Sequence, residues 1–408
     1  MASTRTRGIL PFAPPNITDD DIDEVVAALR SGWITTGPRT RLFEQKFAEL
    51  VSVPSALAVN SCTAALHVAL SALNIGEGVD VITTPMTFCS TVHVIEQVGA
   101  RPILVDVDRA TLNVDPDLVA RQVESRKRGD RRIAALMPVH YAGQPCELDP
   151  LLDIAAAHDL AVIEDSAHAL PAWYRDHIVG DVSHPSVRRA VAFSFYATKN
   201  LTTGEGGMLV AAPDVLEAAR VWSLHGMSRD AWRRYDVERQ YEADEDAAWR
   251  YDVGLPGFKY NMSDLQAALG LSQLPRLSSV HQRRREIARQ YVDAFEDVES
   301  LEVPFVRSDV SHAWHLFALR LNLETLRIDR AEFIAHLLER GIAASVHFIP
   351  IHVLSYYRDR YGYAPDDLPV AWREYQRLVS LPIYPQLHDD DVEDVINAVL
   401  DVVACNRR

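Results

Sequence analysis

Cysteine is scarce in this chain of 408 residues, which has only Cys62, Cys89, Cys146 and Cys405. No two of them form a CxxC pair or stand at the spacing of metal ligands, so we predict ordinary thiols and no metal site. Long apolar runs are missing as well. The start, MASTRTRGILPFAPPN, lacks the apolar stretch of a signal peptide, and no segment is long enough to span a bilayer. We therefore expect a soluble, cytoplasmic protein.

Positive charge is also in deficit. Lysine and arginine number 41 against 57 aspartates and glutamates, which gives a formal net charge of −16. Such a chain repels nucleic acid backbones and anionic membranes, so neither is an expected partner. A phosphate-bearing substrate would need a local positive site. A GxGxxG fingerprint is absent too, because Gly204-Glu205-Gly206-Gly207 lacks that spacing, and this argues against a nicotinamide oxidoreductase.

The chain does contain a regular alternation of short apolar runs and helical stretches. The apolar runs fall at residues 56–59, 81–83, 102–107, 133–139, 160–165 and 190–195. Alternation of this kind predicts an α/β domain with a large, mostly parallel sheet. Ligands of such sheets bind beyond the carboxyl ends of the strands, where several polar residues of this sequence stand.

The composition changes after about residue 225. A stretch from Met227 to Tyr251 is crowded with charged and aromatic residues, and we predict that it is a loop that covers the substrate. From residue 263 onward, helical and strand patterns predict a smaller C-terminal α+β domain. We accordingly divide the chain into a large domain at 10–262 and a small one at 263–408.

Three segments carry residues with chemical potential. Lys199 follows an apolar strand in AVAFSFYATKNLTTGEGG, Asp165 ends another in VIEDSAHAL, and NSCTAAL runs from a strand into a helix with small first residues. A buried lysine is a nucleophile, a strand-end carboxylate can pair with a pyridine nitrogen, and helix amides can bind phosphate. Each segment also has an ordinary interpretation as a loop lysine, a turn-capping aspartate or a capped helix. Their order along one α/β domain is more informative than any one of them.

In that order the chain resembles the DegT/StrS-type nucleotide-sugar aminotransferases, which use pyridoxal phosphate and have aspartate-aminotransferase fold type I. The resemblance runs from Leu10 to about Leu387. It rests on SGWITTGP, NSCTAALHVAL, ITTPMTFCST, MPVHYAGQPCELDPL, VIEDSAHAL, FSFYATKNLTTGEGGML, GFKYNMSDLQAA, HAWHLF and SLPIYP. The first, fourth and fifth of these look most like the branch that aminates the sugar carbon C-4.

The resemblance implies a role for each matching position. Lys199 would be the catalytic Schiff-base lysine and proton carrier, Asp165 would bind the pyridine nitrogen, and Phe88 would stack on the ring. The phosphate would be held by Cys62, Thr63, Ala64 and Ser194, with Asn261 reaching it from the partner subunit, so that a homodimer shares its sites. Cys62 is a departure, since the family usually has glycine or alanine between the serine and the threonine of this turn.

Histidines near the predicted site are harder to assign. Many members have glutamine where this chain has His168, which would contact the cofactor hydroxyl unless it is structural. His315 and His347 lie in segments that match substrate-region motifs, and His352 is close in sequence; for these three, structural and substrate roles are equally open. No HExxH spacing supports a metal.

The resemblance implies transfer of an amino group from L-glutamate to a nucleotide-linked keto-deoxysugar, with C-4 as the predicted position. A keto-cyclitol aminotransferase is a close alternative. A sugar dehydratase with the same cofactor is disfavoured, because such relatives replace the Schiff-base lysine by histidine. A non-catalytic partner subunit is disfavoured by the intact Lys199, Asp165 and Ser194.

Overall fold

The computed structural model describes residues 8–126, 131–227 and 251–408, so most of the predicted loop at 227–251 lies outside the described residues. These residues form strands β1 (Leu57–Val59), β2 (Val79–Thr83), β3 (Arg101–Leu104), β4 (Arg132–Met137), β5 (Ala161–Asp165), β6 (Trp173–Tyr174), β7 (His177–Ile178), β8 (Arg189–Ser194), β9 (Gly207–Ala211), β10 (Leu301–Glu302), β11 (Val310–Ser311), β12 (Phe317–Leu321) and β13 (Leu378–Leu381). The helices are α1 (Asp19–Arg30), α2 (Pro38–Leu50), α3 (Cys62–Ala72), α4 (Ser90–Gln97), α5 (Pro116–Glu124), α6 (Leu148–Ala157), α7 (Pro213–Ser223), α9 (Asp264–Gln273), α10 (Leu277–Phe295), α11 (Arg330–Glu339), α12 (Ser355–Tyr361), α13 (Pro369–Arg377) and α14 (Asp389–Asn406). Short 3-10 turns are η1 (Tyr141–Gly143), η3 (Leu274–Arg276), η4 (Ile351–Val353) and η5 (Pro365–Asp367).

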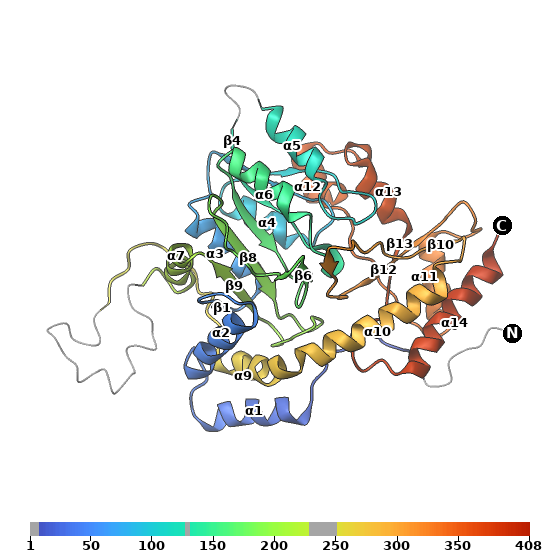
Figure 1. The fold of residues 1–408 in the computed structure, drawn as a ribbon, viewed down its shortest axis with the longest axis horizontal. Coiled ribbons are helices and arrows are strands. Elements are labelled where there is room, and N and C mark those ends of the chain that lie inside the picture. The colour runs from blue at the N-terminus through green and yellow to red at the C-terminus, as the bar shows by residue number, and fades with distance from the viewer. Residues whose placement is uncertain (1–7, 127–130, 228–250) are drawn as a thin grey trace.

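A seven-stranded sheet dominates the fold (Figure 1), with the order β1-β9-β8-β5-β4-β2-β3. The pairs β3–β2, β2–β4, β4–β5 and β5–β8 are parallel, and only β9 runs antiparallel to its neighbours β8 and β1. The predicted α/β class with a large, mostly parallel sheet is confirmed.

Both faces of this sheet are covered, which explains its continuous apolar runs. Along β8, Ala190 and Ala192 join the core that packs under α3 and α7, whereas Val191 and Phe193 join the core on the side of α2. Successive side chains of a strand point to opposite faces. Ser194 therefore points to the same side as Ala190 and Ala192, toward α3.

The C-terminal part has its own sheet, in the order β10-β12-β13, and its own apolar core with α10, α11 and α14. In Figure 1, α10 runs from beside the large sheet to these C-terminal helices. The helix α9 packs on α1 and α2. A domain boundary at residues 262/263 stays a prediction.

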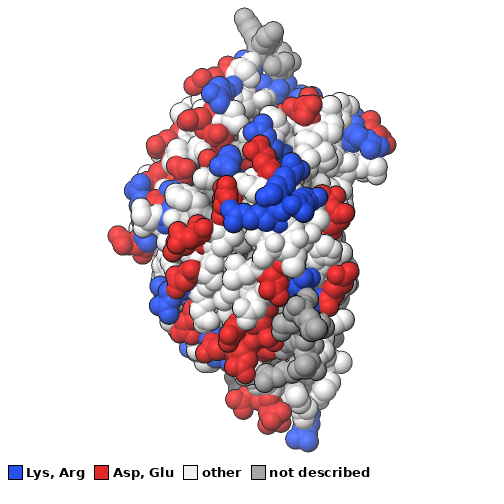
Figure 2. Space-filling view, turned by 90° about the vertical axis from the view of Figure 1, so that its right-hand side faces the viewer, with Lys and Arg blue, Asp and Glu red and all other residues white. Residues whose placement is uncertain are grey.

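Charged side chains are unevenly spread over the face in Figure 2. Acidic groups are scattered over much of it, while basic ones gather in its upper half. Net charge therefore does not prevent local positive surface. Within the described residues, no helix combines the length and apolarity needed to cross a membrane.

Candidate active site

Lys199 lies in the turn that joins β8 to β9, and other segments hold this turn firmly. The amide of Lys199 donates to the carbonyl of Tyr196 at 2.9 Å. The side chain of Asn200 donates to the carbonyls of Leu170 at 2.9 Å and of Ala313 at 3.0 Å. The lysine backbone is thus fixed to both the large sheet and the segment before β12.

The amine of Lys199 points inward. Its Nζ lies 3.4 Å from Nε2 of His315. Burial lowers the pKa of Lys199 from 10.5 to about 8, although the acidic groups of Cys62 and Asp165 oppose the shift. An amine with that pKa is partly neutral near pH 8, and a neutral amine is a nucleophile.

Asp165 stands at the carboxyl end of β5, where it is buried and held from several sides. Its Oδ2 accepts a hydrogen bond from the hydroxyl of Thr91 at 2.7 Å, and its Oδ1 accepts one from the amide of Ala167 at 3.1 Å. The thiol of Cys62 approaches Oδ1 at 3.9 Å. Thr91 in turn shares a bond of 2.7 Å with Thr87. Groups of the chain itself therefore fix the orientation of the carboxylate, before any ligand binds.

A cradle forms where β1, β9 and β8 meet the start of α3. Gly207 pairs with Val59 on one side and Ser194 on the other. Ser61 caps α3, and its hydroxyl accepts a bond from the amide of Ala64. A Cβ at Gly207 would lie 2.5 Å from the carbonyl carbon of Ser61 and 2.6 Å from the amide of Cys62, so only glycine permits this approach. The first amides of a helix have no intrahelical acceptor and attract phosphate.

We expect Gly207→Ala to weaken cofactor binding at least about tenfold and to destabilise the fold by about 1–3 kcal/mol, because the added methyl group displaces the start of α3. Spectroscopic titration of the apoprotein with pyridoxal phosphate and thermal melts measure both effects. Gly254→Ala is the matched control, since a Cβ there meets open space. Unchanged affinity in the Gly207 variant would contradict the cradle.

Two buried histidines face each other beside the lysine. The ring centroids of His168 and His315 lie 4.4 Å apart, and His168 also stacks on Phe348 at 5.7 Å. Burial is the main cause that lowers the pKa of both histidines well below 6.5, and the charge of Lys199 adds to it. Neither Nδ1 atom has a hydrogen-bond partner within the described part of the chain. Two orphaned polar atoms here indicate a place for a polar ligand.

Gly143 brings these histidines together. Its φ is +104°, and a Cβ there would lie 2.8 Å from the carbonyl of His168 and 3.3 Å from the amide of His315. The amide of Ala313 also donates to the carbonyl of Gly143 at 2.9 Å. Positive φ and close backbone approach both require glycine.

The other predicted residues lie at varied distances from this centre. The ring of His347 stacks on Phe12 at 5.4 Å, its Nδ1 bonds the hydroxyl of Ser380 at 2.9 Å, and burial lowers its pKa to about 4. His347 is followed by Phe348, which touches His168. His352 does not join them, because its Nε2 bonds the carbonyl of Pro365 at 3.1 Å.

Phe88 is exposed, whereas Asn261 is bonded to neighbouring segments. Phe88 is 60% exposed, with its ring 6.3 Å from that of Phe348. The backbone of Asn261 bridges to Val59, and its Nδ2 donates to the hydroxyl of Thr36 at 2.6 Å. Thr63, at the first turn of α3, is partly buried.

These features fit pyridoxal phosphate, the cofactor that the family resemblance implies. The chain presents a cradle that only glycine permits, an oriented carboxylate, an inward amine and, beside that amine, two histidines with orphaned nitrogens. Sequence reasoning missed Thr91, Gly143 and Gly207 as contributors. The sequence alone does not distinguish these three residues from any other threonine or glycine. Only the fold shows which group the hydroxyl of Thr91 contacts and which backbone atoms lie against Gly143 and Gly207. Among the described residues, no group of three or more His, Cys, Asp or Glu side chains could hold a metal ion.

Burial of Lys199 also predicts a pH-dependent stability. Its folded pKa of about 8 lies below the ordinary 10.5, so the charged form destabilises the fold below pH 8 and the penalty fades between pH 8 and 10.5. We expect Lys199→Met to stabilise the cofactor-free protein at pH 7, by no more than about 3 kcal/mol, and hardly at all at pH 10.5. Urea unfolding at both values tests this, with the exposed Lys46→Met as control. An equal gain at both pH values would refute it.

Comparison with known proteins places these features in context. Residues 15–400 match the model of the DegT/DnrJ/EryC1/StrS aminotransferase family. The spore coat polysaccharide biosynthesis protein SpsC of Bacillus subtilis (strain 168) is 46% identical over 396 residues, which cover 97% of each chain. The putative sugar aminotransferase Spr1654 of Streptococcus pneumoniae, solved in its PMP form, has 32% identity and a TM-score of 0.86, with 97% of this chain and 99% of that one covered. A PLP form of Spr1654 is also similar.

A third similar structure is PseC of Helicobacter pylori, an aminotransferase involved in the biosynthesis of pseudoaminic acid. It has 26% identity and a TM-score of 0.85, and the similarity covers 97% of this chain and all of that one.

Proposed function

We propose a specific reaction for this chain, which belongs to the DegT/DnrJ/EryC1/StrS aminotransferase family and is a sugar aminotransferase dependent on pyridoxal phosphate. In the proposed reaction, an amino group moves from L-glutamate to C-4 of a nucleotide-linked keto-deoxysugar in the cytoplasm. The observation that carries the proposal is the inward amine of Lys199, which has a pKa of about 8 and lies at the point where β5, β8 and α3 meet.

Each residue has a task that its surroundings support. Bound pyridoxal phosphate supplies an aldehyde and an electron sink. Lys199 would hold the cofactor covalently and, as a free amine, would carry a proton between the substrate carbon and the carbon of the cofactor to which its nitrogen is joined. Asp165, fixed by Thr91 and Ala167, would keep a proton on the pyridine nitrogen. Because His168 is neutral when buried, it can donate to an oxygen without adding charge.

The phosphate end belongs to the cradle. The amides of Cys62 and Thr63 and the hydroxyl of Ser194 are the proposed donors, since all stand at the start of α3 or the facing end of β8. The amide of Ala64 is also proposed, although it would share its hydrogen between the phosphate and the hydroxyl of Ser61. The thiol of Cys62 is already accommodated against the carbonyl of Ala192 at 3.6 Å. The unusual cysteine therefore needs no enlargement of the turn.

The sugar is proposed to enter from the side of the exposed Phe88. Phe88 is proposed to stack on the cofactor, and His315 and His347 are proposed substrate contacts because they line the same region as His168. C-4 is the proposed position because SGWITTGP, MPVHYAGQP and EDSAHA resemble the branch with that regiochemistry.

A homodimer with shared sites is part of the proposal. Large apolar side chains stay exposed in the single chain on α1, α2 and the loop between them, and so does Phe88; they are Ile22, Leu29, Ile34 and Leu42. Such exposure is typical of surfaces that another subunit covers. Asn261 would then reach the phosphate in the partner's site.

Complementation between two variants tests the shared site. We expect Lys199→Ala and Asn261→Ala to be each severely impaired as pure dimers. A mixed dimer has one complete site of two, so the isolated mixed dimer should have about half of wild-type activity, and a randomly paired mixture about one quarter. Co-expression with two affinity tags isolates the mixed species. If Asn261→Ala alone is fully active, or if the mixed dimer is inactive, Asn261 does not contribute to the active site of the partner subunit.

The reaction itself is tested by absorbance. Protein loaded with pyridoxal phosphate should show a visible band that L-glutamate converts to the pyridoxamine form, and NMR of the product should show the new amine at C-4. A band that glutamate leaves unchanged would contradict the donor and reopen dehydration. Amination of a keto-cyclitol, but of no nucleotide sugar, would overturn the substrate class. Failure to bind cofactor at all would favour a non-catalytic partner subunit.

A further inference from the structure

Arg284 on α10 is a buried cation whose bonded partners are all backbone carbonyls. Its Nη1 donates to the carbonyls of Ile383 at 2.8 Å, Trp314 at 3.1 Å and His315 at 3.4 Å, and the residue is 3% exposed. Within the described ranges no carboxylate is bonded to it. A buried guanidinium without a carboxylate contributes little to stability, so placing these carbonyls is the better account of it.

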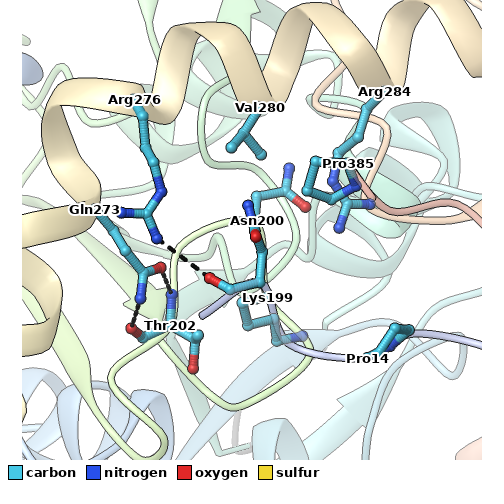
Figure 3. A pocket seen from close by; sticks show the side chains of 10 residues that line it. Pro14, Lys199, Asn200, Thr202, Gln273, Arg276, Val280, Arg284 and Pro385 are labelled. Atoms are coloured by element: carbon cyan, nitrogen blue, oxygen red, sulfur yellow. Dashed lines mark hydrogen bonds between the residues drawn. The ribbon is translucent and has the colours of Figure 1, made fainter. Parts of the chain in front are cut away.

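Two of the three carbonyls that Arg284 binds, those of Trp314 and His315, belong to an unfavourable turn. Trp314 has φ of +49°, a region that bulky residues rarely adopt. Its amide donates to Nδ1 of His312 at 2.8 Å, and its ring stacks on that histidine at 4.2 Å. Strained backbone persists only where its surroundings enforce it. Here Arg284 supplies support from α10, and Figure 3 shows it projecting from that helix beside Pro385.

The turn aims His315 at the lysine. Nε2 of His315 faces Nζ of Lys199 at 3.4 Å, and burial keeps the ring neutral by lowering its pKa well below 6.5. A neutral ring with a proton on Nδ1 offers Nε2 as an acceptor. The amine of Lys199 can therefore donate a hydrogen bond to His315, and its nitrogen lone pair stays free to react.

We propose that Arg284 and His315 form a positioning unit for Lys199, in which Arg284 holds the turn at 314–315 and His315 accepts a hydrogen bond from the lysine amine whenever it is not joined to the cofactor. The inference rests on the proposed role of Lys199. Neither Arg284 nor His315 takes a proton, and both are positioning residues. His315 can contact the substrate as well, since its Nδ1 is not engaged.

The unit has a measurable consequence for the lysine. An ammonium donates a stronger hydrogen bond than an amine, so the acceptor at His315 raises the pKa of Lys199 relative to a site without it. The other groups that bear on the lysine are Cys62, Asp165, His168 and His347. All four remain in the variants below, so a change in the lysine pKa reports on the unit.

The experiment measures the pKa of Lys199 in the cofactor-free protein, from the pH dependence of its acylation by a labelled anhydride and peptide mass spectrometry. His315→Leu should lower this pKa by about one unit, the size expected for one hydrogen bond to a charged group. His315→Gln, whose amide oxygen can accept, should restore most of it. An unchanged pKa in the leucine variant, or equal values in both variants, would overturn the proposal.

Arg284→Lys tests the support from α10, because it keeps a positive charge and loses the planar guanidinium whose Nη1 reaches three carbonyls. It should shift the lysine pKa in the same direction as His315→Leu, and the double variant should show no further shift. Arg276→Lys is the matched control: Arg276 lines a pocket together with Lys199 and Arg284, which Figure 3 shows, but it pairs with Asp21, so the lysine should be unaffected. Additive shifts in the double variant would refute action through His315. If Arg284→Lys does not fold, the comparison of His315→Leu with His315→Gln still tests the proposal.

These readouts do not depend on turnover. If wild-type protein failed to bind pyridoxal phosphate, the proposed function would fall while the lysine titration could still be measured. If the cofactor bound and reacted but the His315 variants left the lysine pKa unchanged, only the positioning unit would fall. The two failures are therefore distinguishable.

Discussion

Lys199→Ala is expected to abolish turnover, with kcat reduced by about 10⁴-fold or more. The variant loses both the covalent attachment and the amine beside His315 that could carry the proton. Steady-state assays with L-glutamate and a nucleotide-linked keto sugar measure the loss. Of the other described lysines, Lys46 pairs with Glu49 on α2 and the backbone of Lys259 bridges to Leu224, so neither is placed to replace it.

Cofactor binding should survive this substitution in weaker form, because the cradle at α3 and the carboxylate of Asp165 remain. Dialysis followed by absorbance distinguishes loss of chemistry from loss of the cofactor. Lys46→Ala, an exposed lysine paired with Glu49 on α2, is the control and should keep wild-type activity. Normal turnover by Lys199→Ala would remove the central assignment.

Asp165→Asn should reduce kcat by about 10³-fold, which corresponds to about 4 kcal/mol of transition-state stabilisation. The amide keeps the shape of the carboxylate and can still accept from the hydroxyl of Thr91. It cannot hold a proton on a pyridine nitrogen by charge, so the electron sink is weakened. Single-turnover kinetics with L-glutamate isolate this half of the reaction.

Thr91→Val gives the graded comparison. It removes one hydroxyl that orients Asp165 and keeps the charge, so the expected loss is about tenfold, the size of one hydrogen bond. If Thr91→Val lowered kcat as much as Asp165→Asn does, misfolding rather than loss of charge would explain both losses. Equal activity of Asp165→Asn and wild type would contradict pairing with the ring nitrogen.

Sequence reasoning identified the family, the enzyme class and the cofactor, all of which the comparisons confirm. It did so because these depend on local patterns. Apolar runs marked the strands of a sheet buried on both faces, and the order of NSCTAAL, VIEDSAHAL and FSFYATKN marked the segments that follow them. The carboxyl ends of parallel strands share one edge, so such segments converge whatever their spacing in the chain.

The contacts between those segments were not readable in advance. Gly207 permits the cradle only because β9 lies between β1 and β8, and Thr91 reaches Asp165 only because α4 packs near the end of β5. Nothing in the sequence distinguishes the three arginines at 283–285 from one another. Packing alone buries Arg284 against the turn at 314–315, since a helix turns each side chain to a different neighbour.

Local chemistry was therefore encoded in the residues themselves: which segments become strands, which residue is the amine and which is the carboxylate. Tertiary structure decided the protonation of the amine, the orientation of the carboxylate and the identity of the supporting residues. The physical reason is that a pKa and a hydrogen bond depend on burial and distance, and both are set by segments that lie more than a hundred residues apart, such as Lys199 and His315.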